Sequence, residues 1–145
     1  MRRKNNRVTL KEAIKFHGHL GPYLVLGILM GDLIINKFKF KKHFGIKAII
    51  KGAVKKPKSC LIDGIQVSTG CTYGKGNIQK IENDKIQVLF CNLRNKKKVK
   101  MSLKEGVIKK LDNLKGHKDS EAFARNLYKT DPLNIFYLTP NTCNL

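Results

Sequence analysis

Acidic residues are scarce in this chain. Among its 145 residues, 30 are Lys or Arg and only 10 are Asp or Glu, so the formal net charge is +20. Such an excess is typical of proteins that bind nucleic acids or other anionic surfaces. The excess is uneven, because residues 37–58 hold nine lysines and no acid, and residues 94–110 hold seven lysines and one arginine against Glu105. Residues 59–93, between these two basic segments, have a net charge of zero. Aromatic residues are few in the basic segments. We therefore interpret them first as solvated lysine faces, and keep nucleic-acid binding and the steering of an anionic substrate as alternatives.

Long apolar runs and paired cysteines are also absent. The longest apolar stretch, residues 22–35, has 14 residues and contains Asp32, whereas a membrane-spanning helix needs about 20. No apolar stretch of signal-peptide length follows the basic N-terminus, so we expect a cytoplasmic protein without a membrane span. The four cysteines form no CxxC pair, which argues against a zinc finger and favours reduced thiols.

The order of predicted elements indicates one α+β domain over residues 1–145, with an antiparallel sheet packed against helices. Thr9-Leu10-Lys11-Glu12 has the form of a capping box that starts a short helix, and residues 22–38 predict a buried apolar helix that begins at Pro22. We expect a strand at 46–54, a helix that Ser59 caps, and a loop at 71–77. Residues 77–82, 85–93 and 98–103 predict an antiparallel meander. A second capping box, Ser102 to Glu105, predicts a helix that Gly116 closes, followed by a last helix at 119–129.

Two histidines and two cysteines are the candidate metal ligands. His17 and His19 flank Gly18, whose conformational freedom allows both imidazoles to converge on one ion. Imidazole with thiolate suits zinc, and also iron or nickel, so Cys60 or Cys71 would complete a tetrahedral site. Each residue also has a structural interpretation, because histidine can cap a helix end and free cysteine is commonly a small buried side chain. Cys91 and Cys143 are interpreted as structural.

A glycine-rich loop carries the candidate ligand-binding residues. Gly74-Lys75-Gly76-Asn77 combines backbone freedom with a cation and an amide, which suits a carboxylate, a phosphate or a formyl-like oxygen. The alternative is an ordinary lysine on a glycine turn. Thr72 and Gln66 complete the predicted ligand-binding set. Asp63, three residues before Gln66, either orients a ligand histidine or simply faces solvent. No residue is assigned a catalytic role.

Two blocks of sequence resemble the E-subunit family of formylmethanofuran dehydrogenase. The first is Phe16-His17-Gly18-His19, followed by Pro22 and a glycine-spaced apolar helix. The second runs from Cys60 through Asp63-Gly64-Ile65-Gln66 to the segment at 69–77. The resemblance covers about residues 10–93 clearly, and extends more loosely to Asp131-Pro132.

The resemblance implies an α+β core, a homodimer and a cavity that binds metal. Among divalent transition metals, zinc is the first candidate. The resemblance predicts a protein of one-carbon (formylmethanofuran) or redox metabolism that is either stand-alone or an accessory part of a larger oxidoreductase complex. With the loop at 74–77, we expect this protein to bind a small anionic or carbonyl ligand. Because the chain has no ferredoxin-like cysteine run, independent dehydrogenase activity is not expected. One position departs from the family, since many relatives carry a cysteine where this chain has Gly21. The alternatives are a nucleic-acid-binding module and a purely structural subunit.

Overall fold

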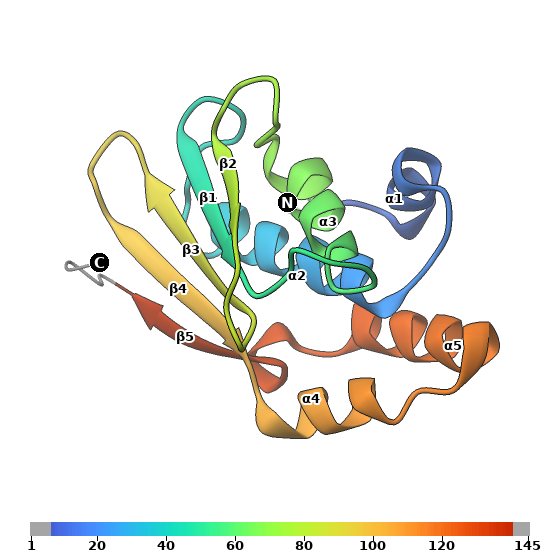
Figure 1. Ribbon diagram of the computed structural model, residues 1–145. Coiled ribbons are helices and arrows are strands. Elements are labelled where there is room, and N and C mark those ends of the chain that lie inside the picture. Colours follow the sequence, from blue (N-terminus) through green and yellow to red (C-terminus); the bar gives the residue numbers. More distant parts are fainter. Residues whose placement is uncertain (1–6, 141–145) are drawn as a thin grey trace, which may run out of the picture.

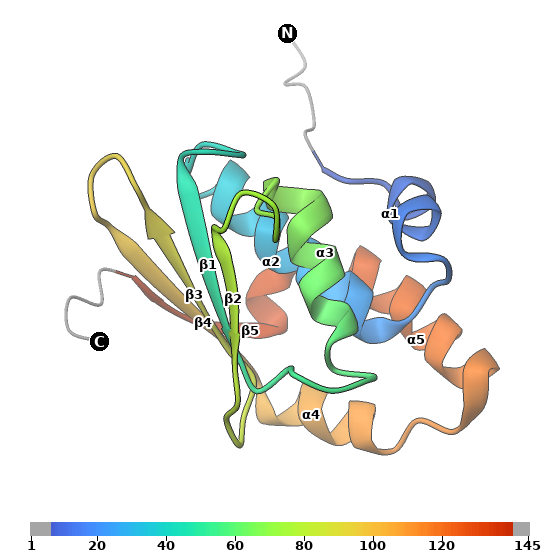
Figure 2. The same ribbon diagram turned by 45° about the horizontal axis from the view of Figure 1, so that its top comes forward.

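The fold is α+β, as the sequence predicts. The computed structural model describes residues 7–140, and all the helices labelled in Figures 1 and 2 lie on one side of a single sheet. Among the described residues, none of the helices is long and apolar enough to cross a membrane. Five strands form the sheet, in the spatial order β2 (Ile78–Ile81), β1 (Ile46–Lys51), β3 (Gln87–Asn92), β4 (Lys98–Leu103) and β5 (Phe136–Pro140).

Helix α2 (Pro22–Asn36) lies at the centre of the molecule. It is apolar on nearly every side, as a helix enclosed by other elements should be. Its main neighbour is α3 (Cys60–Thr69). A Cβ atom at Gly27 would overlap the carbonyl oxygen of Leu61 and lie 2.9 Å from the Cα of Gly64. The two helix backbones are therefore in direct contact, which only glycine permits at this crossing.

The turn that carries the histidines forms as predicted. Helix α1 (Leu10–His17) begins after Thr9, whose hydroxyl accepts a hydrogen bond of 3.1 Å from the backbone N–H of Glu12. It ends at Gly18, which has the left-handed φ of 114° that terminates many helices. Pro22 then occupies the first turn of α2, where its missing N–H has no helical partner to lose. His17 is thus the last residue of α1, and its ring lies beside α3.

The predicted antiparallel meander is wrong for its first strand. Strand β2 does not pair with β3; it pairs in parallel with β1, and β3 pairs with the other edge of β1. Helix α3 connects β1 to β2, and this crossover returns the chain to the end of the sheet where β1 began. β1 itself ends at Lys51, before the predicted residue 54, because Gly52 turns the chain with a φ of +81°.

The C-terminal third also differs from the prediction. Ser102 lies inside β4 and pairs with Gln87 and Tyr137, so it caps no helix. Helix α4 (Glu105–Asp112) follows Lys104 instead, without a side-chain cap. Gly116 is the first residue of α5 (Gly116–Lys129), and does not close α4. Strand β5, which follows a short 3-10 helix (Pro132–Asn134), was not predicted. Ser59 likewise makes no capping hydrogen bond to α3.

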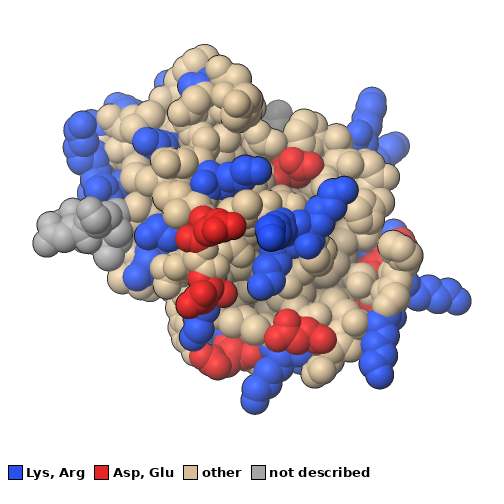
Figure 3. Space-filling model, in the orientation of Figure 1, with Lys and Arg blue, Asp and Glu red and all other residues tan. Residues whose placement is uncertain are grey.

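Charge is distributed unevenly over this scaffold. In Figure 3, Lys and Arg side chains gather at the upper left, near the turn between β3 and β4, with no Asp or Glu visible among them. Acidic side chains appear towards the centre and bottom of the same face. The acid-poor segments of the sequence therefore produce a basic region at one end of the sheet.

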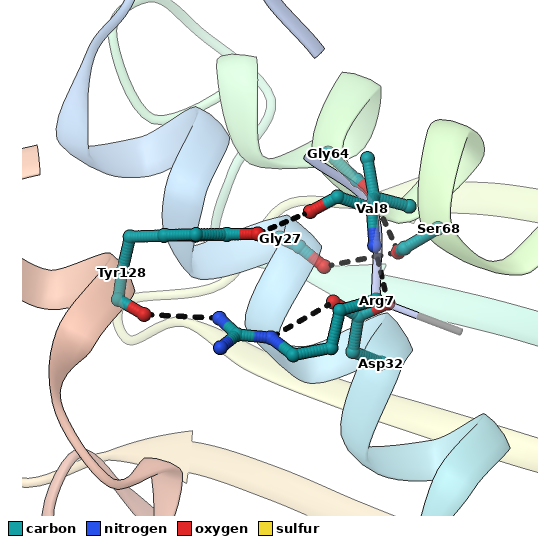
Figure 4. A network of polar contacts seen from close by, with 7 residues as sticks. All are labelled: Arg7, Val8, Gly27, Asp32, Gly64, Ser68 and Tyr128. Carbon is teal, nitrogen blue, oxygen red and sulfur yellow. Dashed lines mark hydrogen bonds and ion pairs between the residues drawn. The ribbon is translucent and has the colours of Figure 1, made fainter. Parts of the chain in front are cut away.

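A buried polar network joins the start of the described chain to the helices (Figure 4). Asp32 on α2 accepts a hydrogen bond of 3.4 Å from the backbone N–H of Val8, and its other oxygen lies 3.9 Å from Nε of Arg7. Arg7 also donates to the carbonyl oxygen of Tyr128 and stacks over its ring. Burial raises the pKa of Asp32 from 3.8 to about 7, against the lowering effects of the Val8 hydrogen bond and the Arg7 charge.

Candidate functional site

His17 and Asp63 form a close pair between α1 and α3. Nδ1 of His17 lies 2.6 Å from Oδ2 of Asp63, and the two side chains are 11% and 36% exposed. The other carboxylate oxygen of Asp63 accepts from Nε2 of Gln66 at 3.3 Å, and Oε1 of Gln66 accepts from the backbone N–H of Tyr73 at 3.3 Å. A chain of hydrogen bonds therefore runs from the loop after α3 to the imidazole.

This pair determines the chemistry of His17. In the neutral imidazole, the contact with Asp63 assigns the proton to Nδ1, which leaves the lone pair on Nε2. Nε2 is buried and has no hydrogen-bond partner among the described residues. An unpaired buried polar atom costs about 1–3 kcal/mol of stability. Such an atom, oriented by a carboxylate, is suited to bind a metal ion, to accept a proton or, once protonated, to donate to a ligand oxygen.

The His17–Asp63 pair borders a cavity of about 600 Å³ between α3 and β2. Its lining combines apolar surface with a few polar groups, which is typical of small-molecule sites. Lys56 and Lys80 also line it and supply positive charge. Further lining comes from Cys60, Ile62, Gln66, Tyr73 and Ile78.

A second cavity, of about 420 Å³, shares His17 and Cys60 with the first. His19 lines it from the turn between α1 and α2, and its ring centroid lies 5.0 Å from that of His17, with the rings tilted by 31°. Asp112 and His117 line it from α4 and α5. Sequence reasoning missed His117, because nothing in the pattern around it indicated that the start of α5 would lie beside the histidine turn.

The predicted metal ligands are only partly brought together. His17, His19 and Cys60 all line the second cavity, but within residues 7–140 no three His, Cys, Asp or Glu side chains are close enough to hold an ion. Burial, and then the charge of Asp63, raise the pKa of the Cys60 thiol. A Cβ atom at Gly21 would lie 3.7 Å from Nε2 of His19. The position where many relatives carry a cysteine is therefore adjacent to this histidine.

Cys71 occupies a different environment. It is fully buried in the core, and its thiol lies 3.7 Å from the carbonyl oxygen of Ile46 on β1. Burial raises the pKa of this thiol. Cys71 lines neither cavity beside His17. Cys60, Cys71 and Cys91 are all free thiols, while Cys143 lies outside the described residues.

Three of the four predicted ligand-binding residues hold their own loop together. The side-chain oxygen of Asn77 accepts from the backbone N–H of Thr72 at 2.9 Å, and its amide nitrogen donates to the carbonyl oxygens of His43 and Ile46. Nζ of Lys75 lies 3.0 Å from the hydroxyl oxygen of Thr72. These three side chains line neither cavity beside His17, whereas Gln66 lines the larger one.

The family model described as FmdE, molybdenum formylmethanofuran dehydrogenase operon, matches residues 16–135. The chain belongs to the FmdE family. The matched range includes both halves of the site, from His17 on α1 to the loop after α3. FmdE proteins are thereby linked to formylmethanofuran dehydrogenase, as the resemblance of the two sequence blocks implies.

A solved structure supports the fold of this FmdE chain. The crystal structure of an FmdE-like protein of the tungsten formylmethanofuran dehydrogenase type, from Syntrophus aciditrophicus, superposes with a TM-score of 0.67. The two sequences are 21% identical, and the match covers 95% of this chain and 74% of that chain. At this identity the likeness shows the fold.

One curated relative is similar over a shorter stretch. A probable S-adenosyl-L-methionine-binding protein of Archaeoglobus fulgidus is 32% identical over 71 residues, which is 48% of this chain and 19% of that protein. The chain thus spans about a fifth of the length of this relative. The name of that larger protein does not indicate which of its parts binds S-adenosyl-L-methionine.

Proposed function

We propose that this chain is a cytoplasmic accessory or stand-alone protein of one-carbon or redox metabolism. It binds a small anionic or carbonyl ligand in the cavity between α3 and β2. The observation that carries the proposal is the buried Nε2 of His17, which has no partner among the described residues and is oriented by Asp63 at 2.6 Å. The free thiols of Cys60, Cys71 and Cys91 accord with a reducing compartment.

The walls of the cavity support an oxygen-rich ligand with a small apolar part. In the metal-free chain, His17 with a proton on both ring nitrogens would donate from Nε2 to a carbonyl or carboxylate oxygen and from Nδ1 to Asp63. Lys56 and Lys80 attract an anion to the opening, and Ile62 and Ile78 offer apolar contact. A formyl or carboxyl group meets these requirements, which accords with the formylmethanofuran link of the family.

The proposed cofactor is a divalent transition metal, with zinc as the first candidate. His17, His19 and Cys60 would hold it once their side chains move closer together, since all three line one cavity and Nε2 of His17 has no partner among the described residues. Bound there, it would polarise a carbonyl oxygen as a Lewis acid. Cys71 would not take part, because its thiol is enclosed in the core beside β1.

Elemental analysis of untagged protein tests this proposal. We expect near-stoichiometric metal in the wild type, and its loss in the His17→Ala/His19→Ala double variant. Cys60→Ser should lower the metal content, whereas the matched control Cys71→Ser should leave it unchanged. Equal or negligible metal in all four proteins would contradict a metal site and favour a purely structural role.

A second variant tests the departure at position 21. Gly21 has an extended backbone, with φ of −147°, that a side chain can adopt. We expect Gly21→Cys to raise the amount of zinc retained after dialysis, because its thiol would arise beside His19. Gly21→Ser is the matched control, since serine has nearly the same size and is a much poorer zinc ligand. Equal zinc retention in both variants would exclude position 21 from the site.

Ligand binding needs its own readout. Formate and N-formylglycine serve as probes in isothermal titration calorimetry on metal-free and zinc-loaded protein. The proposal predicts binding that His17→Ala and Lys80→Ala weaken. A heat signal unchanged in both variants would place the ligand outside this cavity.

We also propose a homodimer and association with a larger oxidoreductase complex. The family link to formylmethanofuran dehydrogenase supports association, and Phe16, which is 55% exposed at the end of α1, offers an apolar contact. Light scattering would show whether purified protein is dimeric, and Phe16→Ser should then weaken the dimer.

A further inference from the structure

The open face of the sheet unites two basic segments that are far apart in the sequence. Strand register places Lys47 and Lys51 of β1 on the same face as Lys98 and Lys100 of β4, with Leu89 of β3 between them. The opposite face of the strands carries the core. None of the outward residues of the five described strands is acidic. They are Lys47, Ile49, Lys51, Gln79, Ile81, Gln87, Leu89, Cys91, Lys98, Lys100, Ser102, Tyr137 and Thr139.

The basic character increases towards one end of the sheet. The backbone N–H of Leu93 donates to the carbonyl oxygen of Gly45, which joins the β3–β4 turn to the loop before β1. That turn carries Arg94, Lys96 and Lys97, and the loop carries Lys39, Lys41 and Lys42. Three acids lie close in sequence to the strands, at the end of the sheet away from the β3–β4 turn. Glu82 and Asp84 follow β2, and Glu105 follows β4. Figure 3 shows the same basic gathering beside the β3–β4 turn.

Exposed apolar side chains accompany these cations. Phe44, in the loop before β1, is 79% exposed, and Leu93 is 49% exposed. Nζ of Lys75 lies 5.6 Å from the centre of the Phe44 ring. The exposed ring of Phe44 offers a face on which an unpaired base can stack, with cations beside it for the phosphates. Aromatic rings beside a basic groove are the elements with which proteins stack unpaired bases.

We propose that this basic face, made of the outward strand residues, the β3–β4 turn and the loop at 37–45, binds single-stranded nucleic acid. Phosphates contact the lysines and Arg94, and a base stacks on Phe44. A second copy of the chain is a poor occupant, because it would oppose the same acid-free surface with like charge. Duplex nucleic acid offers no free base face to Phe44. The proposal does not depend on the His17 cavity, which lies on the helical side of the sheet.

Fluorescence anisotropy with labelled oligo(dT) and oligo(U) of about 20 nucleotides tests the proposal at salt concentrations around 0.15 M. The variant Arg94→Ala/Lys97→Ala removes two exposed cations from the turn. Lys109→Ala/Lys110→Ala on α4 is the matched control, because it makes the same change in net charge at exposed positions away from the basic face. The salt dependence is the slope of log Kobs, the observed association constant, against log salt concentration. We expect the turn variant to make this slope shallower by about 1.4, since each of the two lost single-strand phosphate contacts contributes roughly 0.7. The control should leave the slope unchanged.

Phe44 separates stacking from charge. Phe44→Leu should weaken binding by about fivefold or more, and Phe44→Tyr should retain it, because stacking needs a ring. Equal losses in the turn and α4 variants, no binding near physiological salt, or equal affinity for duplex would overturn the proposal. The proposal would also be overturned if the protein bound only anionic phosphatidylserine vesicles, or if the turn variant dissociated a dimer that the wild type forms. Circular dichroism of each variant confirms that it is folded.

Discussion

Helix α3 has two sides that the molecule uses in opposite ways. On one side, Gly64 lies against Gly27 of α2 with no space for a methyl group. On the other side, Cys60, Asp63 and Gln66 border a cavity of about 600 Å³. Close packing fixes the helix in place, and a fixed helix can hold Asp63 at hydrogen-bond distance from His17. The packed side thus supports the open side, and variants on each should have different consequences.

The largest effect on stability should come from the packed side. Gly27→Ala places a methyl group against the Leu61 carbonyl and Gly64, so α2 and α3 must separate. Overpacking of this kind typically costs about 1–3 kcal/mol, and we expect a loss of about 3 kcal/mol because the methyl group would meet backbone atoms of α3, which cannot move aside as a flexible side chain can. Urea unfolding measures it. Gly106→Ala in α4, where nothing lies within 4 Å of the new methyl, is the control. It should be neutral or stabilise by up to about 1 kcal/mol. A similar loss in both variants would show that the crossing is not specially tight.

Asp32 on α2 should produce an effect of comparable size, because its carboxyl group is buried. Its pKa is about 7 in the folded chain, raised from 3.8 chiefly by burial. The native state therefore binds more protons than the unfolded state between these values. The free energy of unfolding should fall as the pH rises from about 4 to about 7, by an amount on the order of a few kcal/mol, and then level off.

The control for this prediction is Asp32→Asn, which keeps the shape and removes the titration. Urea unfolding of both proteins across pH 4 to 8 should give a smaller decline in the variant, since the other carboxylates are common to both. Parallel pH profiles would mean that the Asp32 pKa in the folded chain is close to its ordinary value.

The sequence predicts individual elements better than it predicts their arrangement. The apolar run after Pro22 and the cap at Thr9 are local signals, and both helices begin at the expected residues, although α2 ends at Asn36, before the predicted residue 38. The order of the strands is not local: β2 is largely exposed and β3 largely buried, so β3 takes the inner position beside β1 although β2 precedes it. That contrast in hydrophobicity was readable, but the meander interpretation relied on adjacency in the chain.

The candidate site shows the same limit. Asp63 was expected to orient a histidine because it shares a helix face with Gln66, and it lies against His17. The amide of Asn77, in contrast, bonds to two backbone carbonyls that only the folded chain brings near. Cys60 and Cys71 have the same side-chain chemistry, and their neighbours in the sequence do not tell which of them lines a cavity. Only tertiary packing separates the cavity residue from the core residue.

The smallest effect on stability, and a large one on function, should come from the open side. Asp63→Asn removes the carboxylate that fixes the His17 tautomer while it keeps the side-chain shape. We expect the free energy of unfolding to change by less than about 1 kcal/mol, because Asp63 is partly exposed and the pair is screened by solvent. Retained metal and affinity for formate should both fall, since Nε2 of His17 would no longer be held ready to bind. If Asp63→Asn unfolds as readily as Gly27→Ala, the His17–Asp63 pair is structural instead. If it retains metal and binds formate as the wild type does, Asp63 is excluded from the site.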